Sequence, residues 1–232
     1  MTQQNPIFCA IDTTDIDKAK RLIGAVAPYV GGIKLGLEFF VHHGAEGVKR
    51  VLPAGTPLFL DLKFHDIPNT VAGAMRALAG LNIFMTTIHA GGGSVMMQAA
   101  KEAASRLPTN PKVLGVTILT SLEEKDMEPL GVQLSVAQQV ERLATLAKTS
   151  GLDGIVCSPH EIANLRKKLG ADFTLVIPGI RPAGSASGDQ KRIMTPKEAM
   201  ELGASYLVIG RPITDAENPA KAAEEIYQSL GN

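Results

Sequence analysis

The sequence predicts an α/β barrel, because eight strand-like runs alternate with helical patterns along all 232 residues. Each run is apolar on both faces, as strands covered on both sides should be. Helical patterns of about ten to seventeen residues separate the runs. Eight strands, each followed by a helix, in a chain of this length indicate a (β/α)8 TIM barrel. A doubly wound open sheet is the alternative arrangement of the same units.

The expected strands follow one another at regular intervals. They are residues 7–12 (IFCAID), 31–36 (GGIKLG), 58–64 (LFLDLKF), 84–90 (FMTTIHA), 113–120 (VLGVTILT), 154–158 (GIVCS), 174–180 (TLVIPGI) and 206–210 (YLVIG).

Several helices begin with clear capping signals. A helix starting near Asp15 and one capped by Ser135 both carry apolar residues at helical spacing. Residues 195–198 (TPKE) form a capping-box pattern with proline at the first helical position. Asn218 before a proline repeats that kind of start for the last helix.

Bulk composition describes one globular domain spanning residues 1–232. Hydrophobic residues make up 45% of the chain, and 23 basic side chains balance 23 acidic ones. Zero net charge gives no general attraction to nucleic acid or to an anionic membrane. No secretion signal or apolar run of about 20 residues is present, so a cytoplasmic protein is expected. Cys9 and Cys157 are expected to be buried core residues rather than a disulfide or metal site.

Charged residues gather where the barrel architecture would place chemistry, at the C-terminal ends of the strands. Asp61 and Lys63 share one face of the third strand because side chains alternate along a strand. Asp12 and Lys34 are expected at equivalent depths on neighbouring strands. Alternating carboxylates and ammoniums would hold Lys63 protonated and placed as a general acid. An ordinary salt bridge is the simpler interpretation of Asp61 and Lys63 alone, but convergence of four charges favours function.

A second group of residues suits a phosphate. Gly210 allows close approach of a ligand to the backbone, and Arg211 can bind phosphate with two hydrogen bonds. The loop at about 181–192 contains glycine, serine and several donors, and its position favours a phosphate lid over a plain surface loop. The run 89–94 (HAGGGS) is better interpreted as a tight turn than as a phosphate cradle. The histidines show no spacing typical of metal ligands.

The stretch DLKFHDIPNT, residues 61–70, resembles the D-x-K-x-x-D-I-P-N-T signature of the orotidine 5'-monophosphate decarboxylase family, in its short bacterial form. Further matches in the same order are A-I-D, K-L-G, T-I-L-T-S, P-G-I-R-P, D-Q-x-R and I-G-R-P-I, so the resemblance covers essentially the whole chain. D-x-K-x-x-D alone is shared by a wider superfamily, whereas the extended pattern is specific.

The resemblance implies a role for each matching residue. Lys63 would donate a proton to C6 of the pyrimidine, and Asp61 would sit beside the substrate carboxylate. Asp66 would serve the neighbouring subunit's site, so the enzyme would be a homodimer. The remaining implied contacts are Asp12 and Lys34 with the ribose hydroxyls, Thr70 across the dimer, Thr120 and Ser121 by the base, Pro178 packed against it, and Arg181, Gln190, Gly210 and Arg211 at the phosphate.

The implied reaction converts orotidine 5'-monophosphate to uridine 5'-monophosphate and CO2 in pyrimidine biosynthesis, with neither metal nor organic cofactor. One alternative is a metal-dependent sugar-phosphate decarboxylase or synthase of the same superfamily. Those relatives would carry a metal-binding glutamate on the second strand, where this chain has Lys34, a cation that would repel Mg²⁺. Another alternative is a non-catalytic barrel that senses a nucleotide, although a binding module has no need of the proton donor Lys63.

Overall fold

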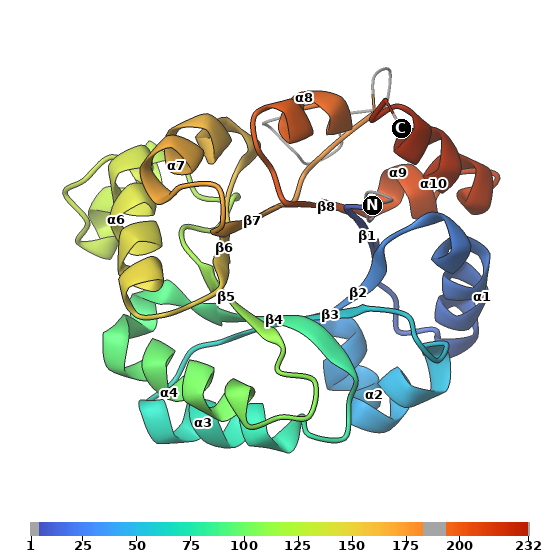
Figure 1. Cartoon of the computed structure of the whole chain (residues 1–232), viewed down its shortest axis with the longest axis horizontal. Coiled ribbons are helices and arrows are strands. Elements are labelled where there is room, and N and C mark those ends of the chain that lie inside the picture. The colour runs from blue at the N-terminus through green and yellow to red at the C-terminus, as the bar shows by residue number, and fades with distance from the viewer. Residues whose placement is uncertain (1–4, 183–193, 232) are drawn as a thin grey trace.

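The computed structural model describes residues 5–182 and 194–231. Eight parallel strands follow one another in sequence order around a closed barrel, and β1 pairs with β8 to complete it (Figure 1). The strands are β1 Ile7–Ile11, β2 Gly32–Gly36, β3 Leu58–Phe64, β4 Ile83–His89, β5 Lys112–Val116, β6 Gly154–Val156, β7 Thr174–Ile177 and β8 Tyr206–Ile209. The predicted barrel is therefore confirmed, and closure rules out the open sheet.

The helices surround the barrel as an outer ring (Figure 1). They are α1 Ile16–Val26, α2 Leu37–Val51, α3 Pro68–Ala77, α4 Gly93–Ser105, α5 Glu124–Met127, α6 Val136–Thr149, α7 Ile162–Leu169, α8 Pro196–Glu201, α9 Arg211–Thr214 and α10 Pro219–Gln228, with short 3₁₀ turns at Ala27–Tyr29, Ala90–Gly92, Glu128–Leu130 and Pro159–Glu161. Across the described residues, no helix combines the length and apolar character that crossing a membrane requires.

The predicted helix starts are confirmed. Asp15 accepts hydrogen bonds from two backbone amides of α1, and Asn218 accepts one from Lys221. Ser135 and Thr195 each form a reciprocal capping box with the third residue of their helix. Each cap satisfies amides that the first helical turn leaves without an intrahelical partner.

The predicted fifth, sixth and seventh strands end earlier than expected, and the fifth differs most. The fifth was expected to reach Thr120, but β5 ends at Val116. It pairs with β6 only through Leu114, Gly115 and Val116, because β6 itself ends at Val156. Without that neighbour, residues 117–120 leave the sheet and become part of the loop beside the barrel mouth.

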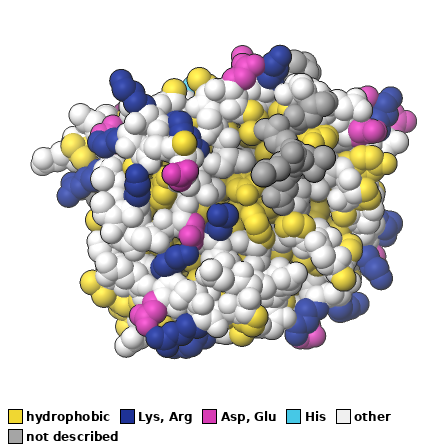
Figure 2. All heavy atoms as spheres, in the orientation of Figure 1, with side chains coloured by type: hydrophobic (Ala, Val, Ile, Leu, Met, Phe, Trp, Pro, Cys, Tyr) yellow, Lys and Arg dark blue, Asp and Glu magenta, His cyan; other side chains and the backbone are white. Residues whose placement is uncertain are grey.

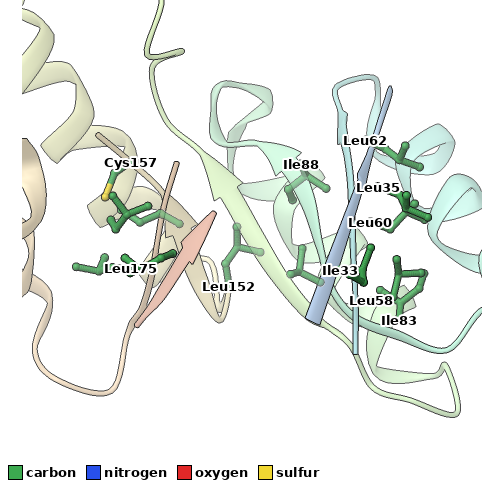
Figure 3. Packing of buried hydrophobic residues seen from close by; sticks show 14 of the residues in the cluster. Ile33, Leu35, Leu58, Leu60, Leu62, Ile83, Ile88, Leu152, Cys157 and Leu175 are labelled. Atoms are coloured by element: carbon green, nitrogen blue, oxygen red, sulfur yellow. The ribbon is translucent and has the colours of Figure 1, made fainter. Parts of the chain in front are cut away.

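The hydrophobic core has two layers, one on each side of the sheet. The outer layer packs the strands against the helices, and Figure 3 shows residues such as Leu35, Leu60 and Cys157 in it. Cys9 is also buried there, and both thiols are free, as predicted. Burial of Cys9 raises the pKa of its thiol to about 12.

The inner layer fills the barrel from its N-terminal end. Phe8 lies at its centre, with ring centroids 6.2 Å from Phe59 and 5.5 Å from Tyr206 in edge-on arrangements. The other members are Ala10, Met85, Leu114, Val176 and Val208, with Phe84 and Val156 packed against them. The interior is thus a packed core rather than a pore.

The molecular surface carries both signs of charge. Lys and Arg side chains are interspersed with Asp and Glu side chains over the face in Figure 2. This distribution agrees with the formal net charge of zero. Any attraction for an anion must therefore come from local groups.

Candidate active site

A cavity of about 260 Å³ opens at the C-terminal ends of the strands, above the packed interior. Its lining comprises Ala10, Asp12, Lys34, Phe59, Asp61, Lys63, Val116, Ile118, Leu119, Thr120, Val156, Pro178, Gly179, Arg181, Val208, Gly210 and Arg211. The lining combines apolar side chains with a few charged and polar ones, which is the usual composition of a small-molecule site.

The two lysines hold a shared carboxylate between them. Lys63 Nζ lies 2.7 Å from Asp61 Oδ2, and Lys34 Nζ lies 3.9 Å from the same oxygen. Lys34 Nζ also lies 3.2 Å from Oδ1 of Asp12. The four charges therefore form one alternating chain of ammonium and carboxylate groups, as the sequence predicts. The Asp61 side chain is 13% exposed and that of Asp12 is 56% exposed, so the array runs from the protein interior to solvent.

The prediction that Asp12 and Lys34 lie at equivalent depths is wrong. Lys34 pairs with Ala10 and Phe59, two residues below Asp12 and Asp61. Its long side chain reaches upward past Gly36, where an added Cβ would lie 3.1 Å from Lys34 Nζ. Gly36 thus leaves the space in which the ammonium meets the carboxylates.

The backbone of Lys63 departs from strand geometry. Its φ is 50°, in the left-handed region that residues with a side chain rarely occupy. The pairing of β3 with β4 also shifts register between Leu60 and Phe64. Such a conformation costs on the order of 1–3 kcal/mol and persists only when neighbouring contacts hold it. Simple alternation, on which the sequence prediction rested, is therefore only part of what aims this side chain into the cavity.

Thr87 on β4 supplies one of those contacts, and sequence reasoning missed it. Its hydroxyl accepts a hydrogen bond from the Lys63 backbone amide at 2.9 Å and donates one to Asp61 Oδ1 at 2.7 Å. Thr87 is fully buried. The only available signal was two adjacent threonines in an otherwise apolar strand.

His65 and His89 form a pair of stacked rings near Lys63. The rings of His65 and His89 stack with centroids 5.2 Å apart. Burial, and then the charges of His65 and Lys63, lower the pKa of His89, while Asp61 acts in the opposite direction. His89 is therefore held toward its neutral form beside the charged array.

The predicted phosphate-binding residues follow β7 and β8. Arg181 is buried, and its guanidinium donates a hydrogen bond to the carbonyl of Ile180 at 3.1 Å. Arg211 is exposed and begins α9 directly after Gly210. Pro178, directly after β7, also lines the cavity. Gln190, and the predicted lid from residue 183 onward, lie outside the described residues.

The other predicted site residues divide into two groups. Thr120 lines the cavity, whereas its neighbour Ser121 is exposed and is not part of the lining. Asp66 and Thr70 are exposed beyond the end of β3 and do not line the cavity of their own chain. Asp66 Oδ1 accepts a hydrogen bond from the amide of Ile67 at 2.7 Å.

Over the residues that the structure describes, no cluster of three His, Cys, Asp or Glu side chains could hold a metal.

The fold and the site together define a (β/α)8 barrel enzyme with a cavity lined by charged side chains at the strand ends. Residues 5–226 match the model of the orotidine 5'-phosphate decarboxylase / HUMPS family. Orotidine 5'-phosphate decarboxylase from Rhodospirillum rubrum is 54% identical over 96% of this chain and 93% of its own length. The enzyme of that name from Erythrobacter litoralis is 51% identical over 97% of this chain and 99% of its own.

Solved structures agree with the sequence comparison. The crystal structure of orotidine 5'-phosphate decarboxylase from Lactobacillus acidophilus superposes with a TM-score of 0.88, at 39% identity, over 98% of this chain and all of that one. The chain belongs to the orotidine 5'-phosphate decarboxylase / HUMPS family.

Proposed function

We propose that this protein decarboxylates orotidine 5'-monophosphate to uridine 5'-monophosphate and CO2. The observation that carries the proposal is the Lys63 ammonium, 2.7 Å from Asp61 and inside the barrel cavity. The names of relatives at 51% and 54% identity support the same activity. The metal-dependent sugar-phosphate alternative is not favoured, since Lys34 stands on β2 within the charged array.

The chemical step breaks the bond between C6 of the pyrimidine and the carboxyl carbon. CO2 leaves, and the electron pair stays in an sp² orbital at C6, where the ring cannot delocalise it well. The Lys63 ammonium stabilises this developing anion and then transfers a proton from Nζ to C6. Lys63 is left neutral and regains its proton from solvent. Asp61 either repels the substrate carboxylate in the ground state or orients Lys63.

The remaining lining residues are proposed to bind the nucleotide. Asp12 and Lys34 would contact the ribose hydroxyls, and the buried position of Lys34 suits a fixed contact. Pro178, Thr120 and Ser121 would border the base. The phosphate would lie between Arg181, Gly210 and Arg211, with Gln190 of the lid closing over it. Phosphate binding energy would drive closure and expel water from the charged site.

We further propose that the active enzyme is a homodimer in which Asp66 and Thr70 reach the partner's site. Large apolar side chains are exposed in the single chain, notably Ile67 next to Asp66 at 68% and Val41 on α2 at 80%. Leu37 and Val95, at the starts of α2 and α4, are also exposed, and these helices follow the strands on either side of β3. Burial of such side chains is a driving force for association.

Turnover of orotidine 5'-monophosphate, followed by loss of its ultraviolet absorbance, tests the proposal directly. We expect turnover by the purified protein, and equal turnover after treatment with EDTA. Loss of activity with EDTA would point to the metal-dependent alternative. Tight nucleotide binding without turnover would point to a sensor.

The proposed reaction belongs to pyrimidine nucleotide synthesis. We propose a cytoplasmic location for the protein, with which its two buried free thiols are consistent.

A further inference from the structure

Thr87 connects the two groups on which the proposed chemistry depends. Its Oγ1 accepts a hydrogen bond from the backbone amide of Lys63 and donates its single proton to Oδ1 of Asp61. A hydroxyl can do both at once, because it carries one donor and two acceptor lone pairs. Because both hydrogen bonds meet at the same oxygen, the direction of each one restricts the direction of the other.

The first bond acts on the backbone of Lys63. At φ 50° and a shifted register, the Lys63 amide is directed to the Thr87 side chain at 2.9 Å. A buried amide without a partner is unfavourable, so this bond helps to hold the left-handed conformation. That conformation in turn sets where the Lys63 side chain leaves the strand.

The second bond acts on the carboxylate of Asp61. Donation to Oδ1 at 2.7 Å occupies one oxygen and leaves Oδ2 facing Lys63 Nζ at 2.7 Å. It also sets the distance of 3.9 Å between Oδ2 and Lys34 Nζ. Rotation of the carboxylate would break the Thr87 bond and disturb both contacts with lysine.

We propose that Thr87 is a positioning residue of the active site, whose hydroxyl aligns the Lys63 ammonium and the Asp61 carboxylate. This inference rests on the proposed decarboxylase function. Thr87 itself does not line the cavity, so it acts through Asp61 and Lys63 rather than on the substrate. A displacement of about 1 Å in such groups can reduce a rate by about a hundredfold.

The neighbouring Thr86 provides a matched control. It is on the same strand, is equally buried, and donates to the carbonyl of Leu60 at 2.8 Å. Its bond joins β4 to β3 without involving any of the charged residues. Thr86→Val and Thr87→Val therefore each remove one buried hydroxyl at nearly constant shape, and only the second touches the site.

The test measures kcat, KM, uridine 5'-monophosphate affinity and thermal midpoint for wild type, Thr87→Val, Thr87→Ser and Thr86→Val. For Thr87→Val we expect kcat to fall about ten- to a hundredfold, with product affinity within about threefold of wild type. Thr87→Ser should recover most of kcat. Thr86→Val should lower the thermal midpoint but keep kcat. If Thr87→Val does not fold, Thr87→Ala against Thr87→Ser makes the same comparison.

The inference is overturned if Thr87→Val keeps kcat within about twofold of wild type. It is also overturned if Thr87→Ser is as impaired as the valine variant, or if Thr86→Val loses as much kcat. Failure of the underlying function looks different, because the wild-type protein would then show no turnover at all.

Discussion

Asp61 and Lys63 are separated by one residue, yet their side chains meet at 2.7 Å inside the cavity. Lys63 makes this contact from a left-handed backbone conformation at the end of β3. The end of β3 thus positions the Asp61–Lys63 ion pair. The strained backbone conformation occurs at the residue for which we propose the chemistry.

Replacing the proposed proton donor should remove chemistry and leave binding. Lys63→Ala deletes the ammonium that stabilises and protonates the C6 anion, so kcat should fall below detection. The variant should still bind uridine 5'-monophosphate, because the phosphate end of the cavity is untouched. Steady-state turnover and calorimetric titration check the two expectations. A variant with near wild-type kcat would refute the assignment of Lys63 as the acid.

Arg211→Ala should weaken substrate binding. Loss of a charge-assisted hydrogen bond to phosphate costs about 1.5–3 kcal/mol, equivalent to roughly ten- to 150-fold in affinity. Lys197→Ala is a suitable control, because Lys197 is an exposed cation on α8 with a 4.0 Å surface contact to Glu201. Titration with uridine 5'-monophosphate compares them. Equal affinity, KM and kcat in Arg211→Ala and wild type would dismiss Arg211 as a phosphate ligand.

Much of the fold follows from local patterns in the sequence. Apolar runs and caps such as Asp15 and Ser135 identify the elements, because the physics behind them acts within a few residues. The end of β5 does not follow in this way. Residues 117–120 have strand-like composition, but whether they pair depends on how far β6 extends, which is a property of the assembled sheet.

The site shows the same division between local and long-range information. Asp61 and Lys63 are found by their spacing, Asp12 by its place at a strand end and Lys34 by its place on the next strand. The depth of Lys34 and the contact of Thr87 depend on strand register across the barrel, which the sequence does not display. The left-handed conformation of Lys63 is equally hidden, since lysine gives no local signal for it.

Folded-state stability should decrease as the pH falls through the range in which His89 would titrate. Its pKa is lowered from the usual 6.5 by burial and by neighbouring His65 and Lys63, so the folded state resists a proton that the unfolded state accepts. The stabilising contribution is complete above pH 6.5 and is lost between that value and the lower folded-state pKa. Thermal midpoints measured from pH 7.5 to 5.5 should fall, and His89→Gln should fall less steeply. The exposed His160→Gln is the control, and an identical slope in all three proteins would contradict the prediction.

Asp66 provides a test of the shared site. Asp66 is exposed and does not line its own chain's cavity, so we expect its catalytic contribution to come across a dimer interface. Asp66→Asn and Lys63→Ala should each be nearly inactive as pure proteins. In a mixed dimer, one site combines the Lys63 of the first variant with the Asp66 of the second, and that site is native.

Mixing the two variants in equal amounts, with subunit exchange, should therefore restore activity. Half of the dimers would be mixed and each would hold one native site, so activity should approach about a quarter of wild type. Mixing Lys63→Ala with Asp61→Asn is the control, because both changes fall in the same strand and each site in the mixed dimer lacks one of the two groups. If Asp66 acts within its own subunit, or if the protein is monomeric, the first mixture stays as inactive as the control. Sedimentation of the mixtures distinguishes those two explanations, since only the monomer lacks a dimer peak.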